Sequence, residues 1–137
     1  MRRSHGTLTF LGLLGPVLRA LELGGTLCVD ELDANLHPLL ALKVVSLFND
    51  PKLNPRSAQI IFTTHDTNLL DKASLRCYQI WFTEKDVEGG THLYPLTDFK
   101  PRKKENLECG YLQGRYGAVP FIGSTDFLAD IPHDKRA

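Results

Sequence analysis

Residues 26–38, TLCVDELDANLHP, decide how the rest of the chain is arranged. Residues 26–29 are short, apolar and partly β-branched, which indicates a buried parallel strand. The strand ends in two adjacent acids, Asp30 and Glu31, and ligands of open α/β sheets bind beyond the carboxyl ends of their strands. Neighbouring carboxylates are costly to bury unless a cation or hydrogen-bond donors compensate. The stretch therefore predicts a site for a metal or a metal-bound phosphate. For Asp33 two roles stay open, as part of this site or as a residue of a helix cap or turn.

A second strand of the same kind follows. Residues 58–64, AQIIFTT, form an apolar run that ends at His65. A helical pattern from about residue 38 to residue 48 lies between the two strands, and Pro38 suits its first turn. Strand, helix and strand within roughly forty residues are typical of a βαβ unit with parallel strands. We therefore expect Asp30, Glu31 and His65 to meet at one edge of the sheet.

The remaining patterns predict shorter elements. Residues 4–23 predict a helix capped by Ser4 and kinked or broken at Gly15-Pro16. Downstream of residue 66 we expect a helix at 67–70, strands at 77–83 and 91–96 that form a hairpin, a helix at 105–113 and a glycine-rich loop at 114–121. Residues 1–123 are expected to form one domain, and residues 124–137 a loose polar tail.

Composition narrows the class of protein. The chain has 137 residues, 42% of them hydrophobic, with 16 acidic and 16 basic side chains, which argues against disorder and against a general affinity for nucleic acid. No apolar stretch is long enough and free enough of glycine and proline to predict a membrane span. Three cysteines without a Cys-x-x-Cys motif predict neither a zinc clip nor a disulfide framework, and we expect Cys28 and Cys77 to be core thiols. These features fit a protein of the reducing cytoplasm.

One local basic cluster stands out. Residues 100–104, KPRKK, lie between the predicted hairpin and the next helix. A solvated loop is the favoured interpretation of such a run, and contact with phosphate or nucleic acid is the alternative. Nucleic acid therefore stays open as a possible partner.

Four motifs in order resemble those of ABC-type ATPases. Residues 4–7, SHGT, are similar to the signature motif, residues 26–31 to a Walker B strand with its glutamate, residues 34–37 to the D-loop, and residues 62–65 to the H-loop. Together with the segments at 30–38, 63–67 and 114–120, they resemble prokaryotic AAA/ABC-type ATPases of the abortive-infection group. These are relatives of the overcoming-lysogenization-defect (OLD-like) and SMC-type ATPases. The resemblance runs from Ser4 to about Ile122.

The resemblance implies an α/β fold: part of a three-layer P-loop NTPase, ABC-ATPase-like, with a mostly parallel sheet and a C-terminal β-hairpin. It implies that Asp30 holds Mg²⁺, that Glu31 is the general base for the attacking water, and that His65 donates to the γ-phosphate of ATP. It further implies nucleotide contacts across a dimer seam, made by Ser4, Gly6, Thr7, Asn35 and His37. His37 departs from the transporter-type D-loop, in which an aspartate is common.

One element of the resemblance is missing. The sequence contains no Gly-x-x-x-x-Gly-Lys-Ser/Thr motif and no identifiable Q-loop glutamine. In P-loop enzymes the glycine-rich loop and its lysine make most of the contacts that bind the phosphates. We therefore expect a C-terminal half of such an ATPase, with weak or no hydrolysis alone. Half a sheet leaves an exposed edge and an apolar face, so we expect a homodimer or an N-terminal partner that carries the P-loop.

Two alternatives remain. The chain could be a non-catalytic interaction module that keeps the ATPase fold, in which case Glu31→Gln changes nothing measurable. It could also be a metal-dependent phosphoesterase or nuclease that uses Asp30, Glu31, Asp33 and His65 as ligands. That alternative predicts cleavage of DNA or RNA that needs metal and no ATP.

Overall fold

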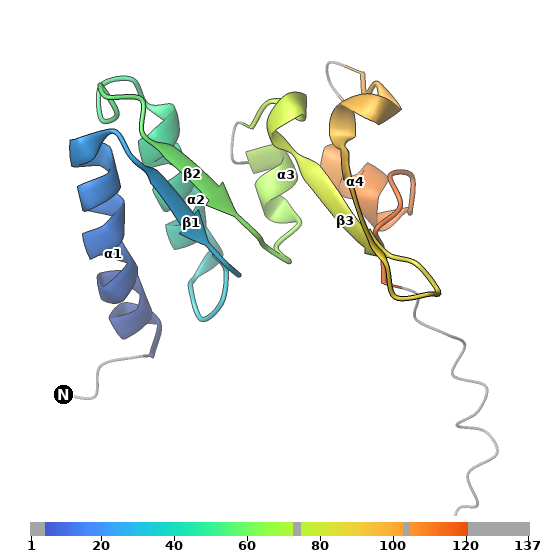
Figure 1. The fold of residues 1–137 in the computed structure, drawn as a ribbon, viewed down its shortest axis with the longest axis horizontal. Coiled ribbons are helices and arrows are strands. Elements are labelled where there is room, and N and C mark those ends of the chain that lie inside the picture. Colours follow the sequence, from blue (N-terminus) through green and yellow to red (C-terminus); the bar gives the residue numbers. More distant parts are fainter. Residues whose placement is uncertain (1–4, 73–74, 103–104, 121–137) are drawn as a thin grey trace, which may run out of the picture.

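The computed structural model describes residues 5–72, 75–102 and 105–120. The elements in chain order are α1 (His5–Leu23), β1 (Thr26–Val29), α2 (Pro38–Asn49), β2 (Gln59–Phe62), α3 (Asn68–Lys72), β3 (Trp81–Lys85), β4 (Thr91–Pro95) and α4 (Leu107–Leu112), with short 3₁₀ turns at Cys77–Gln79 and Leu96–Phe99 (Figure 1). The chain is a mixed α/β protein with one parallel and one antiparallel pair of strands. The predicted tail at 124–137, Ser4 and residues 103–104 of the basic cluster lie outside the described residues.

The strand–helix–strand prediction is confirmed. β1 and β2 pair in parallel, with Thr26 opposite Gln59 and Val29 opposite Phe62. α2 connects them, with Pro38 in its first turn. The two strands therefore end at the same edge, where Asp30 and Thr63 follow.

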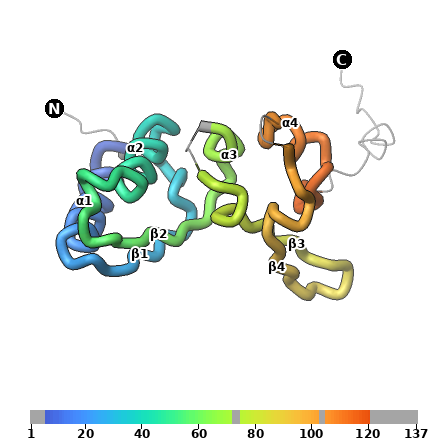
Figure 2. Tube along the Cα trace, turned by 90° about the horizontal axis from the view of Figure 1, so that it is seen from above, coloured from blue at the N-terminus to red at the C-terminus, as the bar shows by residue number. Residues whose placement is uncertain are grey.

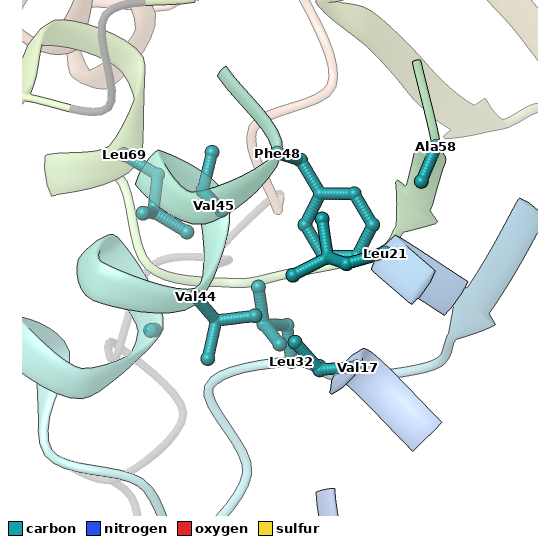
Figure 3. Packing of buried hydrophobic residues seen from close by; sticks show 9 residues of the cluster. Val17, Leu21, Leu32, Val44, Val45, Phe48, Ala58 and Leu69 are labelled. Carbon is teal, nitrogen blue, oxygen red and sulfur yellow. The ribbon is translucent and has the colours of Figure 1, made fainter. Parts of the chain in front are cut away.

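Both α1 and α2 cover one face of this parallel pair. Leu27, Val29, Ile60 and Phe62 pack against a core to which both helices contribute. Figure 3 shows that core close up, with Val17 and Leu21 of α1 beside Val44, Val45 and Phe48 of α2, together with Leu32, Ala58 and Leu69. Apolar side chains recur at helical spacing on each helix, so one stripe of each is buried.

The opposite face of β1 and β2 is open in the described part of the chain. The alternate strand positions, Thr26, Cys28, Gln59 and Ile61, are exposed. In Figure 2 the strands run along one side of the molecule and α2, α3 and α4 lie on the other. The described residues thus form two layers, and the third layer of the expected fold is not formed by them. The prediction of a core thiol is wrong for Cys28, because its strand position faces the uncovered side.

The expected break in the first helix is wrong. α1 continues from His5 to Leu23 with Pro16 inside it. Pro16 leaves the carbonyl of Gly12 without its helical donor. Both residues lie on the exposed face of α1, so water can serve that carbonyl and the helix persists.

α1 is also long and apolar enough, by length and composition alone, to cross a membrane. This differs from the expectation that no stretch would pass such a test. Core helices of soluble proteins and N-terminal signal sequences pass the same test, so one such helix is weak evidence for a membrane span. Of this stretch of α1, 11% is buried, and Val17 and Leu21 lie in the core described above.

The second part of the chain is a hairpin packed on α4. β3 and β4 pair in antiparallel fashion, as predicted, and the ring of Phe82 stacks on those of Tyr111 and Tyr116. Residues 77–79 form a 3₁₀ turn where a strand was expected. The backbone N–H of Arg76 donates to the Gln79 side chain there, so this segment bonds to itself and pairing starts only at Trp81.

Hydrogen bonds join the hairpin part to α3. The Thr67 hydroxyl donates to Glu108 Oε1 at 2.7 Å. The Asp71 carboxylate accepts from the backbone N–H groups of Leu107 and Glu108, at 2.9 and 3.1 Å. Asp71 thereby satisfies N–H groups that the start of α4 would otherwise leave without partners.

Candidate functional site

The candidate site lies where β1 and β2 end. The hydroxyl of Thr63 donates to Asp30 Oδ1 at 2.5 Å. The hydroxyl of Thr64 donates to Asp33 Oδ1 at 2.6 Å. Two hydroxyls from the end of β2 thus hold two carboxylates from the end of β1. The expected meeting of the two strand ends is confirmed, and the direct contacts there join Asp30 and Asp33 to Thr63 and Thr64, two residues of the H-loop-like segment to which no role had been assigned.

Glu31 and His65 face each other at this edge. Glu31 Oε1 lies 4.0 Å from His65 Nε2, and the two side chains are 58% and 85% exposed. The predicted general base and the predicted phosphate sensor are therefore brought together. Asp30 and Glu31 are both exposed at the open edge of the sheet, so the cost of burying neighbouring carboxylates does not arise here.

The backbone at Glu31 has an unusual conformation. Its φ is +49°, in the left-handed region that side-chain-bearing residues rarely adopt. Its N–H donates to the Thr63 hydroxyl oxygen at 2.8 Å. The next residue, Leu32, is 1% exposed and belongs to the core. The segment thus turns outward at Glu31 and inward at Leu32, which presents the Glu31 carboxylate to solvent.

Asp33 belongs to the site network and does not cap α2. Burial alone raises the pKa of Asp33, but hydrogen bonds from the Thr64 hydroxyl and from backbone N–H groups, including that of His65, outweigh it and hold the pKa below its usual value. The N-cap of α2 is His37, whose Nδ1 accepts from the Leu39 N–H at 3.2 Å. Asp33 is therefore an ionised anchor between the strand ends.

The first turn of α1 meets the turn after β1. A Cβ placed on Gly6 would lie 3.0 Å from the carbonyl oxygen of Asn35, whose own φ is +58°. In Figure 1 the N-terminal end of α1 and the C-terminal ends of β1 and β2 lie at the same end of this unit. Gly6 and Asn35 thus lie in close contact, and Thr7 follows Gly6 in the first turn of α1. His37 is exposed, with its ring engaged as the cap of α2, and Ser4 lies outside the described residues.

The donor set at this edge fits Mg²⁺ bound mainly through water and phosphate. Among the described residues no three or more His, Cys, Asp or Glu side chains are close enough together to hold a metal ion. The joint ligand set of the phosphoesterase alternative is therefore not formed. Mg²⁺ in nucleotide sites keeps several waters and takes one or two carboxylates. Asp30, at the strand end, suits that smaller demand.

Sequence analysis missed the roles of Thr63 and Thr64. The signal was available, since the parallel register that aligns Val29 with Phe62 also aligns Asp30 with Thr63. A hydroxyl side chain opposite a carboxylate on the neighbouring strand end forms a short hydrogen bond. Residue pairing across the strands, once fixed, would have pointed to Thr63, whereas the bond from Thr64 to Asp33 does not follow this register.

Comparison with known families gives one match. The model described as "AAA domain, putative AbiEii toxin, Type IV TA system" matches residues 2–71. This segment runs from the start of α1 into α3 and contains Asp30, Glu31, Asp33 and His65. No curated protein and no solved structure gives a match.

Proposed function

The chain belongs to the family of AAA domains described as putative AbiEii toxin, Type IV TA system. On this basis we propose that it forms half of an ABC-type ATPase site, which binds Mg²⁺ and ATP. A nucleotide-binding, ATPase-like function is what membership of an AAA family suggests in general. The finer assignment rests on one observation. Glu31 and His65 approach to 4.0 Å beside Asp30, at the edge where parallel strands place their ligands.

Each acid has a role suited to its place. Bound Mg²⁺ and ATP supply the reactive phosphate and neutralise its charge. Asp30 would hold the metal through a coordinated water, and its second oxygen, Oδ2, has no hydrogen bond from any described residue. Glu31 would orient the attacking water and accept its proton, and its carboxylate is 58% exposed and so accessible to a water molecule. His65 would donate from Nε2 to a terminal phosphate oxygen.

The turn of α1 near Asn35 provides the second set of contacts. We assign Gly6 and Thr7, with Ser4, to the phosphate of a nucleotide held by another subunit, since helix N-termini suit anions. The carbonyl oxygen of Asn35 lies so close to Gly6 that a Cβ at this position would be in tight contact with it, at 3.0 Å. In this proposal Asn35 and His37 line the seam between subunits.

The missing P-loop comes from a partner in this proposal. The sequence has no Gly-x-x-x-x-Gly-Lys-Ser/Thr, so this chain alone has weak or no hydrolysis. The uncovered face of β1 and β2 supports the proposal that another layer packs there, because the apolar side chain of Ile61 is 61% exposed on this face. The partner that supplies the P-loop is an N-terminal segment that carries it, and a second copy of this chain would complete the seam without supplying a P-loop. The setting is phage defence or a DNA-linked process, by analogy with the abortive-infection ATPases that the sequence resembles.

A second candidate is an interaction module that has kept the fold without the chemistry. The observation in its favour is His37, whose Nδ1 caps α2 and so already has a structural role within this chain. It predicts no nucleotide binding under any condition, and it predicts that substitutions at Asp30 and Glu31 leave partner binding unchanged.

The test is a calorimetric titration with a non-hydrolysable ATP analogue, with and without Mg²⁺. We expect weak binding that needs Mg²⁺, that is lost in Asp30→Ala and that is kept in Glu31→Gln. Asp98→Ala is the matched control, because Asp98 is exposed and makes no hydrogen bond among the described residues. Binding that ignores Mg²⁺ or the loss of Asp30, or no binding at millimolar analogue, would overturn the proposal.

A further inference from the structure

Thr63 makes hydrogen bonds to each of the four consecutive residues 29–32 at the end of β1. Its backbone N–H donates to the Val29 carbonyl at 3.1 Å, and its carbonyl accepts from the Leu32 N–H at 2.9 Å. Its hydroxyl donates to Asp30 Oδ1 at 2.5 Å and accepts from the Glu31 N–H at 2.8 Å. A hydroxyl group has one donor and two acceptor positions, so one side chain can serve both partners. Thr63 thus fixes a carboxylate and the neighbouring backbone together.

This second bond matters because of the conformation of Glu31. A residue with φ of +49° persists only where its surroundings impose that conformation. The backbone bonds of Thr63 fix the residues on either side, at Val29 and Leu32. The hydroxyl is what holds Glu31 itself, through its N–H. Without it, the N–H would face solvent and the turn could relax.

The segment that contains Thr63 also fixes the position of His65, the histidine that faces Glu31. His65 lies two residues after Thr63, and its N–H donates to Asp33 Oδ1 at 3.2 Å. The distance between Glu31 and His65 is therefore set by two neighbouring threonine–acid pairs, Thr63 with Asp30 and Thr64 with Asp33. Of the two, only Thr63 also holds the backbone of the proposed general base.

We propose that Thr63 is a positioning residue of the site, whose hydroxyl fixes the Asp30 carboxylate for Mg²⁺ and holds Glu31 in its outward-facing conformation. This inference rests on the proposed function for its chemical meaning. The hydroxyl occupies Oδ1 of Asp30 and so orients Oδ2 for a metal-bound water. Groups that orient a metal-ligating side chain by a hydrogen bond strongly affect the affinity for the metal.

The first test is hydrogen exchange of the Glu31 amide, followed by NMR on the full chain. Thr63→Val keeps the shape and removes the hydroxyl, so we expect roughly fivefold or faster exchange at Glu31. Thr63→Ser keeps the hydroxyl and should restore slow exchange. Thr67→Val is the matched control, because it removes a comparable hydroxyl–carboxylate bond, to Glu108, outside the site. Equal exchange in Thr63→Val and wild type, or no rescue by serine, would overturn the inference.

The second test separates this inference from the proposed function. In the calorimetric titration, Thr63→Val should weaken Mg²⁺-dependent analogue binding by roughly tenfold or more, with little change in Mg²⁺-independent binding. Thr63→Ser and Thr67→Val should bind as wild type does. If wild type binds and Thr63→Val binds equally well, the positioning role fails. If exchange quickens as expected but wild type binds no nucleotide, the proposed function fails and Thr63 is only a structural clamp. Should Thr63→Val not fold, Thr63→Ala is judged by the same criteria.

Discussion

Removal of the Asp33 carboxylate should destabilise the domain measurably. In Asp33→Ala the Thr64 hydroxyl and the His65 N–H lose an ionised acceptor, at 2.6 and 3.2 Å. Hydrogen bonds to charged groups contribute about 1.5–3 kcal/mol each, and the partial exposure of Asp33 reduces that sum. We expect a loss of about 2 kcal/mol, which corresponds to a fall of about 8 °C in Tm for a domain of this size.

The effect should also depend on pH in a defined direction. Despite burial, hydrogen bonding by Thr64 and by backbone N–H groups keeps the pKa of Asp33 below its usual value of 3.8. The folded carboxyl group therefore binds its proton less tightly than the unfolded one. The stabilisation from ionisation is complete above the unfolded pKa and is lost as pH falls through the folded pKa. The difference between wild type and Asp33→Ala should shrink on acidification.

Urea denaturation followed by far-UV circular dichroism at neutral and at acidic pH measures both effects. Asp98→Ala is again the control, and its free energy of unfolding should stay within about 0.5 kcal/mol of wild type. Equal destabilisation by Asp33→Ala and Asp98→Ala would refute the reasoning. So would a difference between wild type and Asp33→Ala that does not shrink at acidic pH.

Three further outcomes follow from the packing. Leu32→Ala should cost about 2–5 kcal/mol in urea unfolding, because Leu32 is 1% exposed beneath the acidic turn, whereas the exposed Leu39 should tolerate alanine. Gly110→Ala should cost about 1–3 kcal/mol and alter the near-UV signal, because the added Cβ would lie 2.8 Å from the Tyr116 hydroxyl; an unchanged spectrum and stability would contradict this packing. Burial and the neighbouring Glu105 raise the pKa of Tyr116 to about 12, so a phenolate absorbance titration should show a late phase near pH 12, and the contribution of Tyr116 to stability should be complete below the usual pKa of 10 and be lost near 12. Loss of that late phase in Tyr116→Phe would assign it.

The pattern of residues 26–66 was enough to predict the parallel unit and the meeting of Asp30, Glu31 and His65. Hydrophobic runs of strand length around a helix allow few topologies, and parallel strands end together. The exposure of Cys28 could not be predicted, because a strand pattern does not say which of its faces another element covers.

The bond from Thr63 to the Glu31 backbone could not be predicted from the sequence, for a different reason. It depends on the left-handed backbone at Glu31, a residue type that rarely adopts that conformation. The 3₁₀ turn at residues 77–79 was likewise missed, because β-rich composition does not show a side chain that bonds to the local backbone. Periodicity thus located the elements and their edge, while the hydrogen bonds that shape the site depend on tertiary geometry.

The most direct test of the nucleotide site is a map of amide chemical shifts in the ¹⁵N-labelled chain during titration with Mg²⁺ and a non-hydrolysable ATP analogue. The account predicts saturable shifts at Asp30, Glu31, His65 and Gly6, with the hairpin at 81–95 unaffected. Shifts that gather on the hairpin, or no shifts at millimolar analogue, would contradict the assignment of this strand edge as a nucleotide site.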